Sequence, residues 1–403
     1  MKILIISYHT CPVNKLGSKD SGGLNIYLRE ISKELTTKGL IVDIFTRKHD
    51  IRDPQEIAIN NNAKVVHLSA GDLSENKHNM HNYINLFTTN LLNYIDQHNL
   101  QYDLIYSNYW MSGMVGELIS EKLKIPHIIT FHTMGLTKRI VNYLEDESDF
   151  RIDNELNLIK TTDAIVVPTY QEKENLILNY KSENNIYIVA PGVDLEKFKS
   201  KNKLESREKL RLSQNIKILL SVGRLEPLKG YDMLINALSL LNTNDDFDVR
   251  LLIIGGDSKS EKELIRLNSL ILKLGLSNQV NLLGAIEHDE LPLYFSAADV
   301  FVMPSAYETF GIAALEASAC NLPVIAPQVG GLKSVVKHAQ TGFLSADRCP
   351  ESLMHYLEIL LKNQPLREQF GVNSRLHAMN YSWEKSSKDL ISVFENVLSK
   401  CLA

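Results

Sequence analysis

Cysteine is scarce in this chain of 403 residues, which contains four cysteines and no CxxC pair. They are Cys11, Cys320, Cys349 and Cys401. Such scatter fits neither a disulfide framework nor a zinc site, and it favours a reducing, cytoplasmic location. No apolar run reaches the roughly 18 residues of a membrane-spanning helix. We therefore expect no integral membrane segment, while peripheral contact with a membrane stays open.

An excess of positive charge is also missing. Lysine and arginine number 43 against 48 aspartates and glutamates, which gives a formal net charge of −5. This balance argues against nucleic acid as a partner, although a local basic patch would be compatible with it. The apolar start Met1–Tyr8 is too short for a secretory signal and has no small-residue cleavage site after it, so we expect a buried strand there.

Short apolar runs alternate with longer stretches of helical periodicity along the chain, which is typical of βαβ units. The first series of predicted strands is Lys2–Ser7, Ile41–Thr46, Lys64–Leu68, Asp103–Ser107, His127–Phe131, Ala164–Pro168 and Ile186–Ala190. The second series is Lys217–Val222, Val249–Ile254, Gln279–Leu283, Val300–Met303, Pro323–Ala326 and Gly342–Leu344. The segment Pro191–Phe198 and the polar run Lys199–Lys209 separate the two series.

We therefore predict an α/β protein with two doubly wound, Rossmann-like domains, residues 1–192 and 193–380, facing each other across a cleft. The third segment, residues 381–403, has apolar side chains at helical spacing, which predicts a terminal helix docked by Trp383. These side chains are Leu390, Val393, Phe394 and Val397.

The segment Asp299–Glu316 is the most informative in the chain. Its predicted strand ends at Pro304, a loop with Glu308 follows, and a helix that carries Glu316 then begins. Ligands of open α/β sheets bind outside the carboxyl ends of the strands. Two glutamates about two helical turns apart could both contact one elongated ligand. The alternative is a surface helix with solvated glutamates.

Groups that suit an anion recur near the predicted strand ends. The N–H groups that open the helix favour a phosphate or a sugar oxygen. They belong to Phe310, Gly311 and Ile312. The loop after Lys217–Val222 carries Arg224 and Lys229, two cations that could stabilise a leaving phosphate or be ordinary surface cations. Gly255-Gly256 and His288 also fit either a ligand contact or a structural role.

A glycine-rich loop follows the first predicted strand. In Asp20–Tyr27, Gly22 and Gly23 would free N–H groups and let the backbone approach a ligand, with Asn25 nearby. The loop does not have the GxGxxG pattern, so the sequence does not support a dinucleotide-binding fold.

Together these segments resemble retaining glycosyltransferases of family 4, which have the GT-B fold. Glu308 and Glu316 match the E-x7-E segment of that family, and Arg224 and Lys229 match its G-R-x4-K-G segment. Three further segments are similar to the subgroup of inositol-phosphate N-acetylglucosaminyltransferases and sucrose-phosphate synthases, although Tyr106 and Asn108 stand where histidines are usual. These segments are Asp20–Tyr27, Tyr106–Gly113 and Thr130–Gly135.

The resemblance implies that the donor is a nucleoside diphosphate sugar, with UDP favoured. Glu308 would contact sugar hydroxyls and Glu316 the ribose, while Arg224 and Lys229 would hold the diphosphate. Further donor contacts are expected from Gly22, Gly23, His288, Phe310, Gly311 and Ile312.

On the acceptor side, the resemblance places His132 beside the transferring sugar, the alternative being a core histidine bonded to backbone. The expected acceptor-binding residues are Asn25, Lys77, Tyr109, Thr133 and Arg151, and Arg151 with Glu155 is similar to an R-x-x-x-E element of the family. Two cations and two hydroxyls would suit a dianionic phosphate. Scattered surface cations and a neutral acceptor are the alternative.

The implied activity is metal-independent, retaining transfer of a hexosyl or N-acetylhexosaminyl group to a small polyol or sugar. The residues expected to be catalytic are His132, Arg224, Lys229 and Glu308. Asp246-Phe-Asp248 imitates a DxD metal motif but precedes a strand, so we expect no metal site and no cofactor. The family also implies a last helix that returns to the N-terminal domain. A transferase acting on polysaccharide or lipid, a non-catalytic nucleotide-sugar binding protein and a homodimer all stay open.

Overall fold

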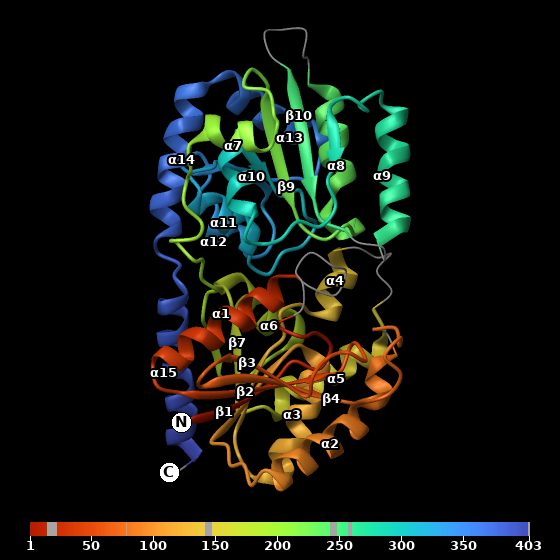
Figure 1. The fold of residues 1–403 in the computed structure, drawn as a ribbon, viewed down its shortest axis with the longest axis vertical. Coiled ribbons are helices and arrows are strands. Elements are labelled where there is room, and N and C mark those ends of the chain that lie inside the picture. Colours follow the sequence, from red (N-terminus) through yellow and green to blue (C-terminus); the bar gives the residue numbers. More distant parts are fainter. Residues whose placement is uncertain (14–21, 78, 142–146, 242–247, 257–259, 402–403) are drawn as a thin grey trace. The chain divides into compact units, whose positions relative to one another are not determined.

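The computed structural model describes residues 1–13, 22–77, 79–141, 147–241, 248–256 and 260–401 (Figure 1). They form two compact units. The first unit holds the start of the chain, Leu24–Ala190 and the segment from Trp383 onward. The second unit holds Pro191–Ser382 together with Gly22 and Gly23.

An eight-stranded sheet forms the centre of the first unit. In sheet order its strands are β3 (Glu56–Asn60), β4 (Ala63–Leu68), β2 (Ile41–Arg47), β1 (Lys2–Ile6), β5 (Leu104–Asn108), β6 (His127–Thr130), β7 (Ala164–Val167) and β8 (Ile186–Ile188). All neighbours are parallel except β3 and β4. The sequence analysis predicted every strand except β3. The central strands are buried on both faces, which explains their continuous apolar runs.

Helices cover both faces of this sheet. They are α1 (Gly23–Thr37), η1 (Met80–Tyr83), α2 (Ile84–Gln97), α3 (Trp110–Leu123), α4 (Gly135–Val141), α5 (Asp149–Thr161), α6 (Tyr170–Tyr180) and α15 (Trp383–Cys401). One apolar core joins the sheet to α2, α3, α5 and α6. Elsewhere Tyr27 of α1 lies edge-on to Trp383, with 6.0 Å between ring centroids, and Tyr106 of β5 packs on Phe394 of α15.

A six-stranded parallel sheet forms the centre of the second unit. In sheet order its strands are β11 (Val280–Leu282), β10 (Val249–Ile254), β9 (Lys217–Val222), β12 (Val300–Val302), β13 (Val324–Pro327) and β14 (Gly342–Ser345). The helical elements are α7 (Lys203–Lys209), η2 (Pro227–Lys229), α8 (Tyr231–Leu240), α9 (Glu261–Lys273), α10 (Leu291–Ala297), α11 (Ile312–Ala319), α12 (Leu332–Val335), α13 (Pro350–Lys362) and α14 (Gln364–Ala378). A second apolar core joins the sheet to α8, α9 and α13.

Two Rossmann-like units and a last helix in the first unit confirm the predicted fold class. The helix α15 buries the four apolar side chains that predicted it, and none of them is more than 4% exposed. Figure 1 shows α15 (blue) beside the first unit's sheet, far along the chain from the strands that it covers. Within the residues that the structure describes, no helix is both long enough and apolar enough to cross a membrane.

Candidate active site

The parallel strands β1, β5 and β6 of the first unit end at the same edge of the sheet, and β5 and β6 are each followed by a predicted ligand-binding residue. Asn108 of β5 pairs with Thr130 of β6, and β1 pairs with β5 on its other side. Tyr109 therefore follows one strand end and His132 another. Both residues have positive φ angles, 84° and 60°. Residues other than glycine seldom adopt such angles, and those that do are concentrated at functional sites.

Tyr109 is surrounded by basic side chains. The Nζ atom of Lys77 lies 4.7 Å from the centre of its ring, and the guanidinium carbon of Arg151 lies 5.0 Å away. Burial raises the pKa of the Tyr109 phenol, but the charges of Arg151 and Lys77 outweigh burial, and the pKa falls below its ordinary value. Tyr109 is thus a buried aromatic contact shared by both predicted phosphate-binding cations.

Arg151 is a buried cation held on several sides. Its Nε donates to Glu155 over 2.7 Å and its Nη1 to Glu147 over 2.8 Å. Its Nη2 donates to the carbonyl of Thr133 over 2.8 Å and to the hydroxyl of that residue over 3.3 Å. Arg151 is 3% exposed and Glu155 is fully buried, which rules out a scattered surface cation. The predicted acceptor residues Lys77, Tyr109, Thr133 and Arg151 are therefore brought together in the structure.

His132 is a neutral imidazole with a defined orientation. Burial lowers its pKa to about 3. Its Nε2 lies 2.9 Å from the side-chain oxygen of Asn108, which can only accept, so Nε2 carries the proton and Nδ1 is an acceptor. Asn108, whose role the sequence left in doubt, thus orients His132. Tyr106 bonds the hydroxyls of Tyr27 and Thr130, each over 2.7 Å.

Asn25 lies on α1 and is 1% exposed. Its amide nitrogen donates to the hydroxyl of Thr10 and to the carbonyl of Cys11, each over 2.7 Å. These bonds fasten the turn after β1, so the amide hydrogens of Asn25 are used within the protein. Asp20 and Ser21 of the glycine-rich loop lie outside the described residues.

His9 is a site residue that the sequence analysis missed. Its ring lies 4.2 Å from that of Tyr109, it is 6% exposed, and its Nδ1 has no hydrogen-bond partner among the described residues. Burial lowers its pKa well below the ordinary value, and the charges of Lys77 and Arg151 lower it further. Its position two residues after the predicted strand Lys2–Ser7 was the available signal. The positive potential that it feels would favour an anion.

Arg47 was missed as well. This side chain at the end of β2 is fully buried and donates from Nε to the carbonyl of Ala70 over 2.6 Å and from Nη2 to the carbonyl of Asp72. It therefore holds the start of the loop that carries Lys77. A buried arginine bonded to backbone has no sequence signature, because its acceptors are carbonyls.

In the second unit, two predicted donor residues pair with each other. Lys229 donates to the carboxylate of Glu308, which also accepts from the hydroxyl of Ser305 over 3.0 Å. Glu308 lies in the loop after β12, and α11 begins only at Ile312. Glu308 therefore lies in the loop and Glu316 on the helix, as the sequence predicted, but the spacing of about two helical turns between them does not apply, since the helix begins only after Gly311.

Close backbone packing fixes these loops. Gly255 has φ of 137°, and a Cβ atom there would lie 1.8 Å from the carbonyl oxygen of Gly223, so only glycine fits. A Cβ atom on Gly331 would lie 2.1 Å from the carbonyl oxygen of Thr309. Arg224 follows Gly223 and pairs with Glu226 over 2.9 Å. The loops that carry the predicted diphosphate and sugar contacts are thus held by glycines.

Gly311 is the N-cap of α11, with φ of 95°. Phe310 before it is 3% exposed and packs 5.7 Å from the ring of Tyr381, so its side chain belongs to the core. Any ligand contact from Phe310 would come from its backbone N–H. Asp246 lies outside the described residues, and Asp248 precedes β10, at the edge opposite the carboxyl ends of the strands.

Glu316 on α11 is linked to His288, another predicted donor residue. The Nε2 of His288 lies 2.6 Å from Oε1 of Glu316, and both residues are buried. The Nδ1 of His288 lies 2.8 Å from Nζ of Lys197. The structure thus joins Glu316 and His288 and adds Lys197, which the sequence analysis did not single out.

Comparisons with known proteins agree with this architecture. Residues 21–197 match the profile "Glycosyltransferase Family 4", and residues 202–377 match "Glycosyl transferases group 1". A D-inositol 3-phosphate glycosyltransferase of Corynebacterium diphtheriae is 33% identical over 402 residues, which cover 98% of this chain and 94% of the relative.

Two solved structures share the fold. A sucrose-phosphate synthase from Thermosynechococcus elongatus has a TM-score of 0.93 at 28% identity, with 99% of each chain covered. HepE of Anabaena, solved in complex with UDP and glucose, has a TM-score of 0.78 at 19% identity, with 98% of this chain and 100% of the other covered. The chain therefore belongs to glycosyltransferase family 4, as a GT-B hexosyltransferase that uses nucleotide-sugar donors.

Proposed function

We propose that this enzyme transfers a hexosyl or N-acetylhexosaminyl group from a UDP-sugar, with retention, to a hydroxyl of a small phosphorylated polyol or sugar. The observation that carries the acceptor assignment is the gathering of Lys77 and Arg151 around the ring of Tyr109, with Thr133 bonded to Arg151. The name of the Corynebacterium relative and that of the sucrose-phosphate synthase also support a phosphorylated acceptor or product.

In this proposal the acceptor phosphate binds to Lys77, Thr133 and Arg151. Glu155 and Glu147 hold the guanidinium in place, so its orientation costs little when the ligand binds. The phosphate would then direct one acceptor hydroxyl toward the transferring sugar. His132, neutral and oriented by Asn108, would accept a hydrogen bond from a hydroxyl of that sugar at Nδ1.

On the donor side, cleavage at the sugar C1 leaves negative charge on the β-phosphate. Arg224 and Lys229 would stabilise this charge, and its increase in the transition state makes their contribution catalytic. Lys229 would exchange its contact with Glu308 for the diphosphate, which would leave Glu308 for the sugar hydroxyls. The acceptor hydroxyl attacks C1 on the same face of the sugar from which the diphosphate leaves, and an oxygen of the β-phosphate takes the proton of that hydroxyl. These cations would do the work that a metal does in other transferases, so the reaction requires no metal.

The test is a screen of nucleotide release. UDP-glucose and UDP-N-acetylglucosamine are each offered with fructose 6-phosphate, inositol 3-phosphate and the dephosphorylated forms. We expect release only with a phosphorylated acceptor. Release that ignores the phosphate would refute the acceptor assignment and indicate a neutral glycan or a lipid. Donor binding with neither transfer nor hydrolysis would refute the catalytic proposal.

The Lys77→Met variant sharpens the screen. A hydrogen bond to a charged group is worth about 1.5–3 kcal/mol, so the KM for the phosphorylated acceptor should rise about tenfold or more. Donor hydrolysis should not change. Lys122→Met, on the exposed side of α3, is the matched control. An unchanged KM in Lys77→Met would remove this lysine from the acceptor site.

A further inference from the structure

Lys197, which is not among the predicted donor residues, contacts one of them, His288. Lys197 lies on a tight turn in which the carboxylate of Asp194 accepts from the backbone N–H of Lys197 over 2.9 Å. Arg375 donates to the carbonyls of Leu195 and Phe198 on the same turn, over 3.1 Å and 2.6 Å. The backbone that presents Lys197 is therefore fixed from two sides.

The chemistry of the contact defines the protonation state of His288. An ammonium group can only donate, so Nδ1 of His288, 2.8 Å from Nζ of Lys197, must accept. The single ring proton is then on Nε2, where it is donated to Oε1 of Glu316 over 2.6 Å. His288 is 8% exposed and packs 5.1 Å from the ring of Phe198, so the ring cannot turn freely.

The ammonium group of Lys197 has other contacts besides the one to His288. Its Nζ also donates to the carboxylate of Asp289, which is largely exposed, and lies 5.4 Å from the ring of Phe198. Among the described residues, the contact of this ammonium with His288 leads toward α11. Removal of the ammonium would take the Lys197 donor away from Nδ1 and let the ring proton move there, and the hydrogen bond from Nε2 to Glu316 would then be lost.

We propose that Lys197 is a positioning residue for nucleotide binding, which acts on Glu316 through the tautomer of His288. The proposal rests on the proposed use of a UDP-sugar donor and on the ribose contact that the resemblance implies for Glu316. A carboxylate fixed at Oε1 can present its second oxygen to a diol in one orientation, and this preorganisation lowers the cost of binding. Lys197 contributes no contact to the nucleotide.

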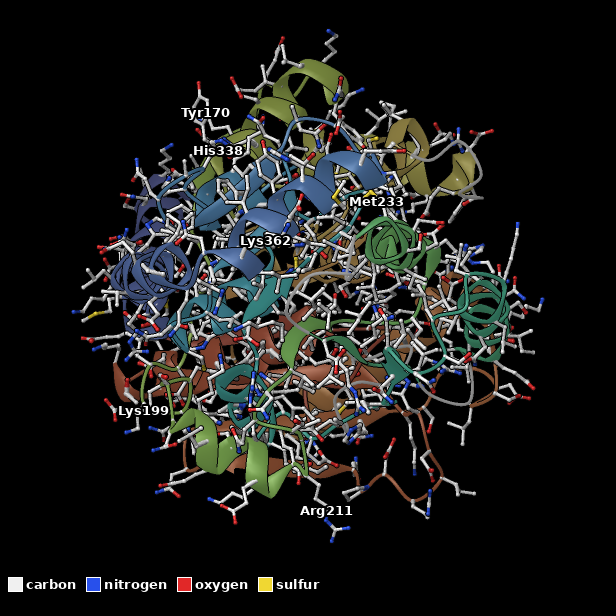
Figure 2. The ribbon with its side chains drawn as sticks, turned by 90° about the horizontal axis from the view of Figure 1, so that it is seen from above. Tyr170, Lys199, Arg211, Met233, His338 and Lys362 are labelled. Carbon is white, nitrogen blue, oxygen red and sulfur yellow. The ribbon has the colours of Figure 1, made fainter. Side chains whose placement is uncertain are left out.

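The test compares Lys197→Met with Lys199→Met by calorimetric titration of UDP and of 2′,3′-dideoxy-UDP. Lys199 is the matched control, since its exposed side chain pairs with Glu196 at the periphery of the second unit (Figure 2). We expect Lys197→Met to weaken UDP about tenfold, the effect of one lost partner of a charged group. Binding of the dideoxy nucleotide, which has no diol for Glu316, should not change. Lys197→Arg retains a donor and should restore most of the affinity.

A ligand-independent measurement separates this proposal from the donor assignment. The ¹⁵N shifts of His288, assigned with His288→Gln, should show the Nε2–H tautomer in the unmodified protein and a mixture in Lys197→Met. If the unmodified protein has the Nδ1–H tautomer, or if UDP affinity is the same in both lysine variants, the proposal is wrong. If the unmodified protein does not bind UDP, the donor assignment fails, and the tautomer measurement still decides the role of Lys197.

Discussion

The two units neutralise the charges of their predicted sites in different ways. In the second unit, the predicted donor residues pair with one another or with a near neighbour: Lys229 with Glu308, His288 with Glu316 and Arg224 with Glu226. In the first unit, Arg151 pairs with Glu147 and with the fully buried Glu155, and it shares the ring of Tyr109 with Lys77. The difference indicates that a donor would replace the pair of Lys229 and Glu308, whereas the cation of the predicted acceptor site is part of the folded core.

The largest effect is expected from Arg151→Ala, which tests whether the predicted acceptor residues belong to the core. Loss of this cation would leave Glu155 fully buried without its cationic partner, and breaking a buried pair costs about 3–5 kcal/mol. Both tryptophans, Trp110 and Trp383, lie in the first unit, so fluorescence during urea unfolding reports on that unit.

The double variant Arg151→Met/Glu155→Gln is the control, because it removes both charges. It should recover part of the lost stability. If Arg151→Ala unfolds like the unmodified protein, the contrast between the two units is wrong. The buried pair also means that a higher acceptor KM in Arg151→Ala alone would not separate phosphate binding from loss of structure.

The second largest effect is expected in the second unit, where a variant should lose activity without losing stability. In Lys229→Ala, the lost contact to the diphosphate should lower turnover about a hundredfold, since such bonds are worth about 1.5–3 kcal/mol. Thermal unfolding followed by circular dichroism should change little, because the partner Glu308 is partly exposed and can be solvated. The exposed Lys333 provides the control variant Lys333→Ala. Turnover and UDP affinity both unchanged in Lys229→Ala would exclude this lysine from the donor site.

The smallest effect concerns pH and again belongs to the first unit. Burial lowers the pKa of His127 to about 3, against an ordinary value of 6.5. Between these values the unfolded chain binds one more proton than the folded chain, so the free energy of unfolding falls as the pH is lowered from about 6.5. The limiting slope is about 1.4 kcal/mol per pH unit for each such histidine.

His127→Gln should therefore flatten the dependence of the tryptophan-detected urea midpoint between pH 7 and pH 5. Ser107→Ala removes the hydroxyl that lies 2.7 Å from Nε2 of His127 but keeps the histidine. It should lower stability and retain the slope. An equal slope in His127→Gln and the unmodified protein would show that this histidine does not cause the acid sensitivity.

The sequence was sufficient for the parallel strands and not for the edge of the first sheet. The buried strands are recognisable in the sequence as continuous apolar runs, and β9 and β10 have the predicted bounds. The strand β3 was missed because it is short, antiparallel and exposed at alternate positions, and its sequence does not differ from that of a loop of similar composition.

Contacts between distant residues account for the rest of the difference. The sequence analysis selected Lys77, Tyr109, Thr133 and Arg151 by resemblance, and they lie together. It could not foresee His9, Arg47 or Lys197, because a histidine after a strand, an arginine bonded to carbonyls and a lysine in a turn are each common. Their significance depends on which groups the fold brings within reach, and no spacing along the chain encodes that.

The backbone of Tyr109 has a consequence for how this protein could be made more robust. With φ of 84° and ψ of 155°, the residue occupies a region that suits glycine, at a cost of order 1–3 kcal/mol. Glycine at this position would relax the chain and remove the ring on which Lys77 and Arg151 meet. Thermal tolerance and the proposed acceptor recognition therefore make opposite demands on a single position, and selection for the first alone would be expected to erode the second.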